Sequence, residues 1–348
     1  MTDSKRLRGL VESVLSSANA DMPEEEAERL AKTMMTAIGS EFFYGQIGNN
    51  VKAGHRNKQS YANKRTSGKE QYYTSQNVVD ICLEEVRKHV DLSSVNLVEP
   101  CGGTGEFIDG LIRLGVSENN ITSFDIEPKH ELVKQGDYLE QDLSGIPNLV
   151  SITNPPFGRA SSLAKKFFNH DAKFCTHICY LIPKAWRKWS VHNSLDKNFH
   201  LVSDIDLPQN CFYLADGTKK EKDVLNTVFQ VWEKRDQQRP KIKIPDHKLI
   251  QKVIPETTKG NLKVVKGANF SIVAFGHSAG RCEDVTEPVV PYKTTTMYLK
   301  IKDEKVKEAL RQVDLSKFYN NVSYVQALSI QEINYALNEF FGLSNFKF

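Results

Sequence analysis

The sequence lacks several features that would assign it to other classes of protein. Its 348 residues contain only six cysteines, scattered without a paired framework, which is typical of a reduced intracellular chain. The start has no apolar core of a signal peptide, and no apolar run approaches the length of a membrane span. We therefore expect a cytoplasmic protein, or a nuclear one if its cell has a nucleus, that is not secreted and has no membrane partner.

A strong net charge is also lacking, since the formal value is only +3. Partners must therefore be inferred from local charge. Residues 42–69 contain no Asp or Glu but hold six Lys or Arg, and residues 235–266 hold nine Lys or Arg against three Asp or Glu. Each stretch suits a phosphate backbone, although a solvated linker explains it as well.

Hydrophobic periodicity predicts an α/β organisation. Two helices are expected within residues 4–40, and from about residue 70 one helix at 75–88 is followed by apolar, strand-like runs that alternate with helical stretches. That alternation favours a mainly parallel, doubly wound sheet with helices on both faces. The predicted regions are an N-terminal helical pair plus basic linker (1–69), an α/β region (70–235) and a smaller C-terminal α+β region (236–348). The strand-like runs lie at 96–98, 121–124, 149–153, 177–182, 201–207 and 227–233, and the last region is expected to have strands at 270–275 and 295–301 and helices at 303–313 and 329–341.

A glycine-rich loop at residues 98–107 follows the first of these strands. Its glycines allow close backbone approach to a ligand, but the G-x-G-x-x-G spacing of dinucleotide sites is missing, and no Gly-Lys-Ser or Gly-Lys-Thr follows. Glu99 beside the loop would repel a pyrophosphate and suits a cationic ligand such as S-adenosylmethionine. Asp125 ends the next strand, where it can accept hydrogen bonds from ribose hydroxyls. Asp137 could accept from an adenine amine, with Tyr138 or Leu139 packing on the ring.

The run Asn154-Pro155-Pro156-Phe157 follows the strand predicted at 149–153. Two prolines fix φ and remove two backbone donors, so the motif offers a rigid row of carbonyl acceptors. Such acceptors can hold the two hydrogens of a planar exocyclic amine and free its lone pair for attack, while Phe157 offers a stacking face. The alternative is a plain Pro-Pro turn with Phe157 as a core residue.

On these motifs, residues 70–235 resemble the S-adenosylmethionine-dependent amino-methyltransferases of DNA, of the N6-adenine type, in the γ order of motifs. The resemblance implies a Rossmann-like class I methyltransferase fold, S-adenosyl-L-methionine as cofactor, no metal, and a target-recognition region at residues 236–348. It implies cofactor contacts from Tyr73, Thr74, Glu99, Pro100, Gly103, Gly105, Asp125, Asp137 and Tyr138. It implies catalytic contacts from Asn154, Pro155, Pro156, Phe157 and Phe212, the last from a segment at 207–212 that helps to hold a flipped base.

Two departures from the family pattern are visible. The loop reads Cys101-Gly102-Gly103 where the family more often has Ala-Cys-Gly, and Phe157 stands where tyrosine is commoner. Asn154 favours adenine N6 over cytosine N4, where serine is usual. Phe157 in place of tyrosine keeps the stacking face and loses a hydroxyl.

Several functions remain open. The expected function is methyl transfer to adenine N6 by a site-specific, adenine-specific DNA methyltransferase that flips the base out of the duplex. The alternatives are transfer to an RNA base amine (adenine N6 or guanine N2), transfer to a protein glutamine, and a non-catalytic binding module. The sequence does not reveal the recognition sequence, a partner nuclease of a restriction-modification system, or the oligomeric state.

Further residues are candidates for substrate contact. Lys184, Arg187 and Lys188 surround two tryptophans after the strand at 177–182, and Arg281 follows the turn at 276–280. We expect all four to contact the nucleic-acid substrate. The turn itself fits G-x-S-x-G, but no histidine follows His277, which excludes a serine hydrolase in that chain order.

Two cysteine patterns do not carry chemistry. Cys101 lies in the cofactor loop, and not where a cytosine-C5 nucleophile would stand. Cys175, His177 and Cys179 look like metal ligands, but alternation along a buried strand explains them better.

Overall fold

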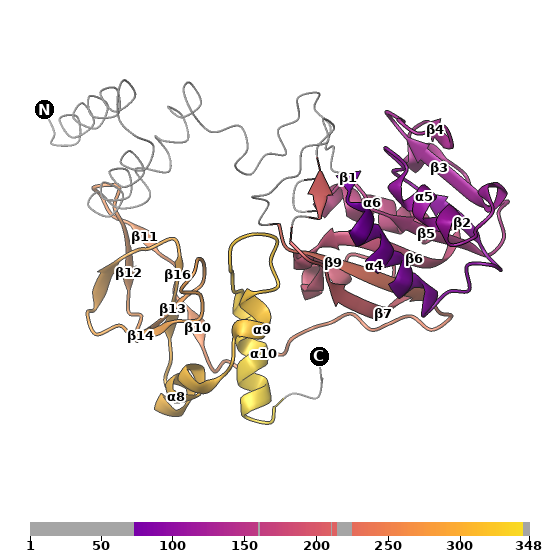
Figure 1. The fold of residues 1–348 in the computed structure, drawn as a ribbon. Helices are drawn as coiled ribbons and strands as arrows, with labels where there is room; N and C mark the ends of the chain where they lie inside the picture. The colour runs from indigo at the N-terminus through magenta and orange to yellow at the C-terminus, as the bar shows by residue number, and fades with distance from the viewer. Residues whose placement is uncertain (1–72, 159–160, 210, 214–224, 344–348) are drawn as a thin grey trace, which may run out of the picture. The chain divides into compact units, whose positions relative to one another are not determined.

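The computed structural model describes residues 73–158, 161–209, 211–213 and 225–343. The helical pair predicted in 4–40 and the basic segment 42–69 lie outside these residues. The helices are α4 (Gln76–Arg87), α5 (Glu106–Arg113), α6 (Ser162–Asp171), α7 (Trp189–His192), α8 (Glu304–Gln312), α9 (Ser316–Tyr319) and α10 (Ile330–Phe340), and the 3-10 turns are η1 (Glu118–Asn120), η2 (Tyr138–Glu140) and η4 (Lys184–Arg187) (Figure 1).

The strands fall into two groups along the chain. Residues 73–234, named here the sheet region, contain β1 (Tyr73–Thr74), β2 (Asn96–Glu99), β3 (Ile121–Asp125), β4 (Val133–Gln135), β5 (Leu149–Thr153), β6 (Cys175–Pro183), β7 (Phe199–Asp206), β8 (Phe212–Tyr213) and β9 (Thr227–Lys234). Residues 236–343, named here the C-terminal region, contain β10 (Gln251–Lys252), β11 (Glu256–Thr257), β12 (Lys263–Lys266), β13 (Phe270–Val273), β14 (Cys282–Asp284), β15 (Val289–Pro291) and β16 (Thr296–Lys300).

The main sheet has the strand order β4-β3-β2-β5-β6-β9-β7. Neighbours from β4 to β6 are parallel, whereas β9 is antiparallel to both β6 and β7. The mainly parallel, Rossmann-like sheet predicted from the sequence is therefore confirmed. The sequence missed β4, whose three residues include only one buried side chain and so show no strand pattern.

Burial explains why the central strands could be recognised. All five residues of β5 are buried, as expected for a parallel strand covered on both faces. Beside the sheet, α4 packs closely on α5, because a Cβ at Gly110 would lie 2.6 Å from the side chain of Leu83 and 2.9 Å from that of Val79. A glycine in the middle of α5 thus lets the two helices approach.

The direction of the chain reverses between β2 and β5. From β2 the chain proceeds to β3 and β4 on one side of the sheet, and β5 is followed by β6 on the other side. The loops that leave the carboxyl ends of β2 and β5 therefore turn away from each other and leave a crevice between them, which is where ligands bind in open α/β sheets. Glu99 ends β2, and Asn154 directly follows β5.

The C-terminal region contains a four-stranded sheet, β10-β16-β13-β14, and a three-stranded sheet, β11-β12-β15. Its strands β13 and β16 and its helices α8 and α10 agree with the α+β prediction, whereas the short elements β10, β11, β12, β14, β15 and α9 were missed. Trp189 of α7 belongs to the hydrophobic cluster of this region, in contact with Phe318 and Tyr335. The Nζ of Lys188 also lies 3.0 Å from the Oε1 of buried Glu332. The boundary drawn after residue 235 stays a prediction.

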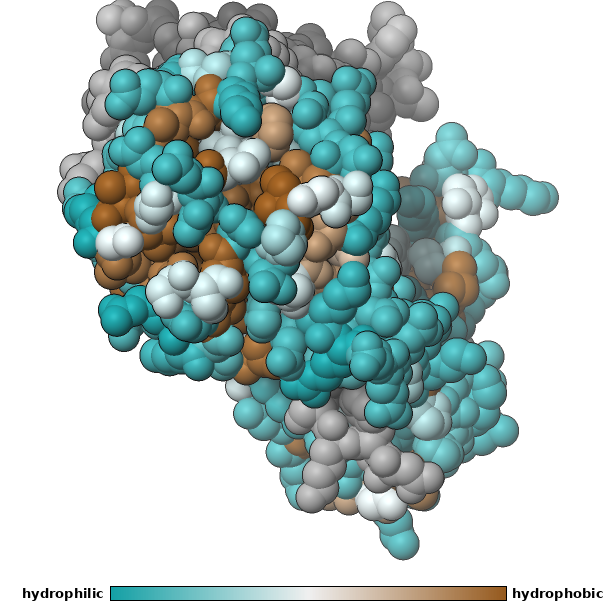
Figure 2. Space-filling view, turned by 90° about the vertical axis from the view of Figure 1, so that its right-hand side faces the viewer, coloured by the Kyte–Doolittle hydropathy of each residue, from teal (hydrophilic) through white to brown (hydrophobic). Residues whose placement is uncertain are grey.

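Figure 2 shows one face of the molecule, on which brown hydrophobic residues gather among teal hydrophilic ones. Large hydrophobic side chains exposed in the sheet region include Ile81, Leu114 and Ile126. Within the described part of the chain, no helix combines the length and the apolar character that crossing a membrane would require.

Candidate active site

A cavity of about 310 Å³ opens at the carboxyl ends of β2, β3 and β5. It is lined by the glycine loop after β2, by the ends of β3 and β5, and by residues from β1, η2 and α6. The sequence analysis names fourteen residues for cofactor and catalytic contacts, and all but Gly105 and Phe212 line this cavity. The lining includes twelve of them: Tyr73, Thr74, Glu99, Pro100, Gly103, Asp125, Asp137, Tyr138, Asn154, Pro155, Pro156 and Phe157.

Gly105, one of the two predicted residues outside the lining, shapes the loop. Its φ is +90°, and a Cβ there would lie 2.4 Å from the ring of His130, so only glycine fits. Gly103 has a φ of +48°, and a Cβ there would lie 3.1 Å from the ring of Tyr73. The two glycines therefore let the loop turn tightly between β2 and α5, beneath Tyr73.

Asp125 is held in one orientation by two backbone donors. The N–H of Gly103 donates to its Oδ2 over 3.0 Å, and the N–H of Glu127 donates to its Oδ1 over 2.8 Å. Each carboxylate oxygen has a further lone pair, and the residue lines the cavity. Asp125 thus offers two fixed acceptors, which is what a pair of ribose hydroxyls requires.

Glu99 is a buried carboxyl group with one unsatisfied oxygen. Its Oε1 accepts from the hydroxyl of Thr153 and, over 3.3 Å, from the N–H of Cys101. Its Oε2 is buried without a hydrogen-bond partner among the described residues. Burial raises the pKa of Glu99 to about 8. An orphaned buried acceptor in a cavity wall fits a ligand that brings a positively charged donor, such as the ammonium group of S-adenosylmethionine.

Asn154 is oriented by a strand from elsewhere in the chain. Its Nδ2 donates to the Oγ1 of Thr74 over 3.3 Å. Thr74 lies on β1, which pairs antiparallel with β8 so that Thr74 faces Phe212 across the two strands. Because the nitrogen end of the amide is directed at Thr74, the oxygen end is the one that can accept from an amine.

Phe157 and Phe212 lie together next to this motif. Their ring centroids are 6.5 Å apart in a T-shaped arrangement, and both side chains are buried. Phe157 lines the cavity, but Phe212 does not belong to its lining. The structure thus places Phe212 against Phe157 but outside the cavity lining, and its contact with a flipped base stays a prediction.

Asp137 and Tyr138 occupy the cavity wall in different ways. Asp137 caps η2 by accepting the N–H of Leu139 over 2.9 Å. Tyr138 is only 2% exposed, stacks on Phe167 with a centroid distance of 5.7 Å, and donates its hydroxyl to Asp171. Burial raises the pKa of Asp171 to about 6. The phenol of Tyr138 is therefore fixed in the core, and only its ring can face a ligand.

Several cavity residues were not singled out from the sequence. Leu163 and Phe167 lie one helical turn apart on α6 and line the cavity with Ile126, which follows Asp125. Tyr213 is not part of the lining but contacts Tyr73, which is, with ring centroids 5.6 Å apart, and its hydroxyl lies 3.3 Å from the Oγ1 of Thr104. The i, i+4 spacing on the helix after β5 is a signal that could have found the first pair.

The four cations predicted to contact substrate lie outside the cavity lining and have carboxylate partners. Arg187 pairs with Asp204 at 2.5 Å and Asp206 at 3.0 Å, and Lys184 pairs with Asp206 at 2.8 Å. Arg281 pairs with Glu283 at 3.1 Å, and Lys188 with Glu332 as described above. These ion pairs give the cations a structural role and compete with a phosphate, so their substrate contacts stay a prediction without support from the geometry.

The cysteine patterns and the G-x-S-x-G sequence form no catalytic or metal site of their own in the described residues. Cys175 and Cys179 are buried in β6, and no group of three His, Cys, Asp or Glu side chains in the described part of the chain could hold a metal ion. The G-x-S-x-G sequence forms the turn between β13 and β14, with φ of +101° at Gly276 and +91° at Gly280. Cys101 lines the cavity from within the glycine loop, as expected.

Comparisons with known proteins found similarity in three-dimensional structure only. No protein-family model matches the sequence, and no curated protein matches it. A protein from Pyrococcus horikoshii, provisionally named an RNA methyltransferase, is 18% identical over 48% of this chain and 88% of its own, with a TM-score of 0.38. The M protein of the type I restriction enzyme EcoKI is 14% identical over 47% of this chain and 44% of its own, with a TM-score of 0.36.

The 23S rRNA methyltransferase ErmE is 13% identical over 47% of this chain and 70% of its own, with a TM-score of 0.33. This chain therefore spans less than half of the EcoKI M protein. The TM-scores are low, and these similarities carry no argument about what this chain binds or does.

Proposed function

We propose that this protein transfers a methyl group from S-adenosylmethionine to the exocyclic N6 amine of an adenine in DNA. The observation that carries the proposal is the shared cavity, whose lining includes Glu99 with its unsatisfied oxygen and Asp125, and also Asn154 to Phe157. The first group suits a cationic nucleoside, and the second suits a planar amine. A site that takes both ligands side by side is what methyl transfer to an amine requires.

The cofactor residues would act by fixed hydrogen bonding. Asp125 would accept from the ribose hydroxyls, since Gly103 and Glu127 already hold its carboxylate in place. Glu99 would accept from the ammonium group, and this contact would compensate the cost of its burial. Ile126, Leu163 and Phe167 would cover the apolar faces of the adenine ring. When bound, S-adenosylmethionine supplies an electrophilic methyl group on a sulfonium sulfur.

The residues around Asn154 would hold the acceptor amine. Its two N–H groups can donate to the side-chain oxygen of Asn154 and to a backbone carbonyl near Pro155, while Phe157 offers its ring to the base. With both hydrogens held, the nitrogen lone pair is directed away from the ring and towards the methyl group. The amine held by Asn154 would take up the methyl group that the cofactor supplies, with the electron pair of the carbon–sulfur bond left on sulfur, and the surplus proton of the nitrogen would leave to solvent. Orientation supplies much of the acceleration in such a site.

A comparison of substrates tests this proposal. The full chain would be incubated with S-adenosylmethionine carrying a labelled methyl group and with duplex DNA, single-stranded DNA, RNA or a glutamine-containing peptide. We expect label in DNA, and digestion to nucleosides should place it on N6 of deoxyadenosine. Label found only in RNA, or only in the peptide, would show that this molecule and not DNA is the substrate. No label in any of them would contradict methyl transfer.

A further inference from the structure

Three loops of the C-terminal region meet at one place. The loop between β13 and β14 is joined to the segment before α10 by the N–H of Gly276, which donates to the carbonyl of Gln326 over 3.0 Å. Phe275 forms an isolated antiparallel bridge with Ala327, and its N–H donates to the carbonyl of Thr295 over 3.1 Å. We name the surface made by residues 274–281, 293–295 and 320–327 the tip surface.

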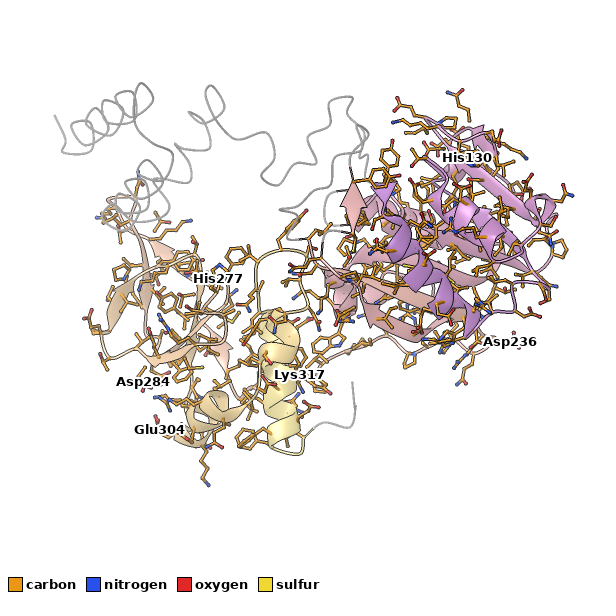
Figure 3. The ribbon with its side chains drawn as sticks, in the orientation of Figure 1. His130, Asp236, His277, Asp284, Glu304 and Lys317 are labelled. Carbon is orange, nitrogen blue, oxygen red and sulfur yellow. The ribbon has the colours of Figure 1, made fainter. Side chains whose placement is uncertain are left out.

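The segments that form the tip surface contain no acidic residues of their own, and Glu283 just beyond them pairs with Arg281 at 3.1 Å. The segments that supply this surface, residues 270–281, 288–301 and 315–331, contain no Asp or Glu. Figure 3 shows the labelled acids Asp284 and Glu304 below His277 in the C-terminal region. The exposed polar residues of the tip include Ser278, Lys293 and Thr294. A polyanion would therefore meet hydrogen-bond donors and the exposed Lys293 here, while the charge of Glu283 is offset by Arg281.

Exposed aromatic and apolar side chains gather on the same surface. Phe275 is 49% exposed and Tyr324 is 37% exposed, and Val325 beside them is 36% exposed. Large exposed rings cost free energy in water unless they serve a contact. Rings on a surface whose own residues include no Asp or Glu fit the bases of a nucleic-acid strand, because every base has a face that can stack on them.

The tip surface is attached to the edge of the main sheet where the cavity opens. The N–H of Asn226 donates to the carbonyl of Ser323 over 2.8 Å, and its side-chain Nδ2 donates to the carbonyl of Val322 over 3.3 Å. The carbonyl of Asn226 in turn accepts the N–H of Lys184, which follows β6. Since β9 is two strands from β5, this attachment lies about 10 Å across the sheet from the strand that ends at Asn154.

We propose that the tip surface binds the DNA strand beside the nucleotide whose base enters the cavity, with bases stacked on Phe275 and Tyr324. The proposal rests on the proposed function, since it takes the substrate to be a nucleic acid. It assigns substrate binding to loops that lie outside the cavity. One of them, Gly276 to Gly280, has the G-x-S-x-G pattern without the chemistry of a hydrolase. The phosphates of the strand lie against the polar residues between the rings.

Binding of labelled oligonucleotides tests the tip surface. Fluorescence anisotropy would give the Kd of the full chain for single-stranded DNA, duplex DNA and RNA of mixed sequence, with the variant Phe275→Ala/Tyr324→Ala beside the wild type. We expect Kd for DNA to rise about tenfold or more in the variant, because each stacked ring contributes about tenfold. The matched control is Phe340→Ala, since Phe340 of α10 is 48% exposed but lies outside the tip surface, and its Kd should not change.

The outcomes separate this proposal from the proposed function. Phe275→Leu, which keeps an apolar side chain without a ring, should also weaken binding, while the Kd for cofactor and the Tm should match the wild type in all variants. Equal DNA affinity in the wild type and the double variant, or an equal loss in Phe340→Ala, would overturn the tip surface even if DNA is methylated. Ring-dependent DNA binding without any methyl transfer would support the tip surface and reject the proposed reaction. Binding of RNA but not of DNA would overturn the assignment of DNA as the nucleic acid that the tip surface binds.

Discussion

The cavity of the sheet region and the tip surface of the C-terminal region differ in how their polar groups are held. In the cavity, Asp125 is fixed by two backbone donors, Asn154 is tied to Thr74, and Glu99 is buried with one unsatisfied oxygen. On the tip surface the rings stand exposed on loops whose own residues include no Asp or Glu. A site fixed in advance suits one small ligand and one reacting atom, whereas an exposed surface without acidic residues of its own suits a long polyanion.

Asn154→Ala is expected to have the largest effect and to separate the two regions most sharply. Removing the side-chain acceptor should lower the methyl-transfer rate about 100- to 1,000-fold, as for loss of one preorganised hydrogen bond in other active sites. The Kd for cofactor and the Kd for DNA should both stay within about twofold of the wild-type values. Neither affinity depends on the single side-chain oxygen that accepts from the reacting amine. Single-turnover kinetics and titration of each ligand measure these values. A parallel loss of cofactor affinity would mean that Asn154 belongs to the cofactor site.

The pH dependence of cofactor binding tests Glu99. Its pKa of about 8 in the free protein means that the carboxyl group is protonated at lower pH and must lose its proton to pair with an ammonium group. Cofactor affinity should therefore rise by up to about tenfold per pH unit from about pH 6 to about pH 7.5, where the ligand amine is still charged. Calorimetry in two buffers of different ionisation enthalpy should detect the released proton.

Glu99→Gln is the control for that pH dependence, since the amide keeps the shape and cannot titrate. Its affinity should be weaker at pH 7.5 and independent of pH over the same range. The free energy of unfolding should change with pH in the opposite direction to cofactor affinity. A carboxyl group whose pKa is raised by folding contributes stability at acidic pH, and this stability is lost as the pH rises towards 8. The cofactor-free Glu99→Gln variant should thus have the higher Tm at pH 8. A pH-independent affinity in the wild type would exclude Glu99 as the ammonium partner.

Thr74→Val is expected to have the smallest effect. The substitution removes the acceptor that receives the Nδ2 of Asn154 and keeps the shape of the side chain. The rate of methyl transfer at saturating cofactor should fall about two- to tenfold, the usual value of one hydrogen bond. Thr74→Ser, which restores a hydroxyl, should recover the rate. A change confined to the Kd for cofactor would show that Thr74 serves the cofactor and not the orientation of Asn154.

The sequence allowed the sheet and most of the cavity to be predicted for a physical reason. Buried parallel strands such as β5 are continuous apolar runs, and glycines or prolines directly after them mark loops with restricted geometry. Glu99, Asp125 and Asn154 each end or follow such a strand, so a single crevice at one edge of the sheet could be expected to collect them. β4 could not be found, because one buried side chain in three residues leaves no pattern.

Local sequence patterns could not predict which side chains pair with one another. Lys184, Arg187 and Lys188 read as a basic cluster in the sequence, but their carboxylate partners lie on β7 and α10, far along the chain. A charge that looks available in sequence can thus be paired in the fold. The ring of Phe212 lies 6.5 Å from that of Phe157, on a strand that pairs with β1, and no local pattern predicted this contact.

The sequence by itself determined which chemical groups stand at the ends of which strands: a carboxyl before a glycine loop, a carboxyl after the next strand, and an amide before two prolines. Those features are local, since they follow from residue type, strand burial and the fixed φ of proline. The tertiary structure alone decided that Glu99 keeps an unsatisfied oxygen, that Thr74 receives Asn154, and that Ser323 attaches the tip surface to Asn226. These contacts join residues distant in sequence, and only strand order and packing bring such residues within hydrogen-bond distance.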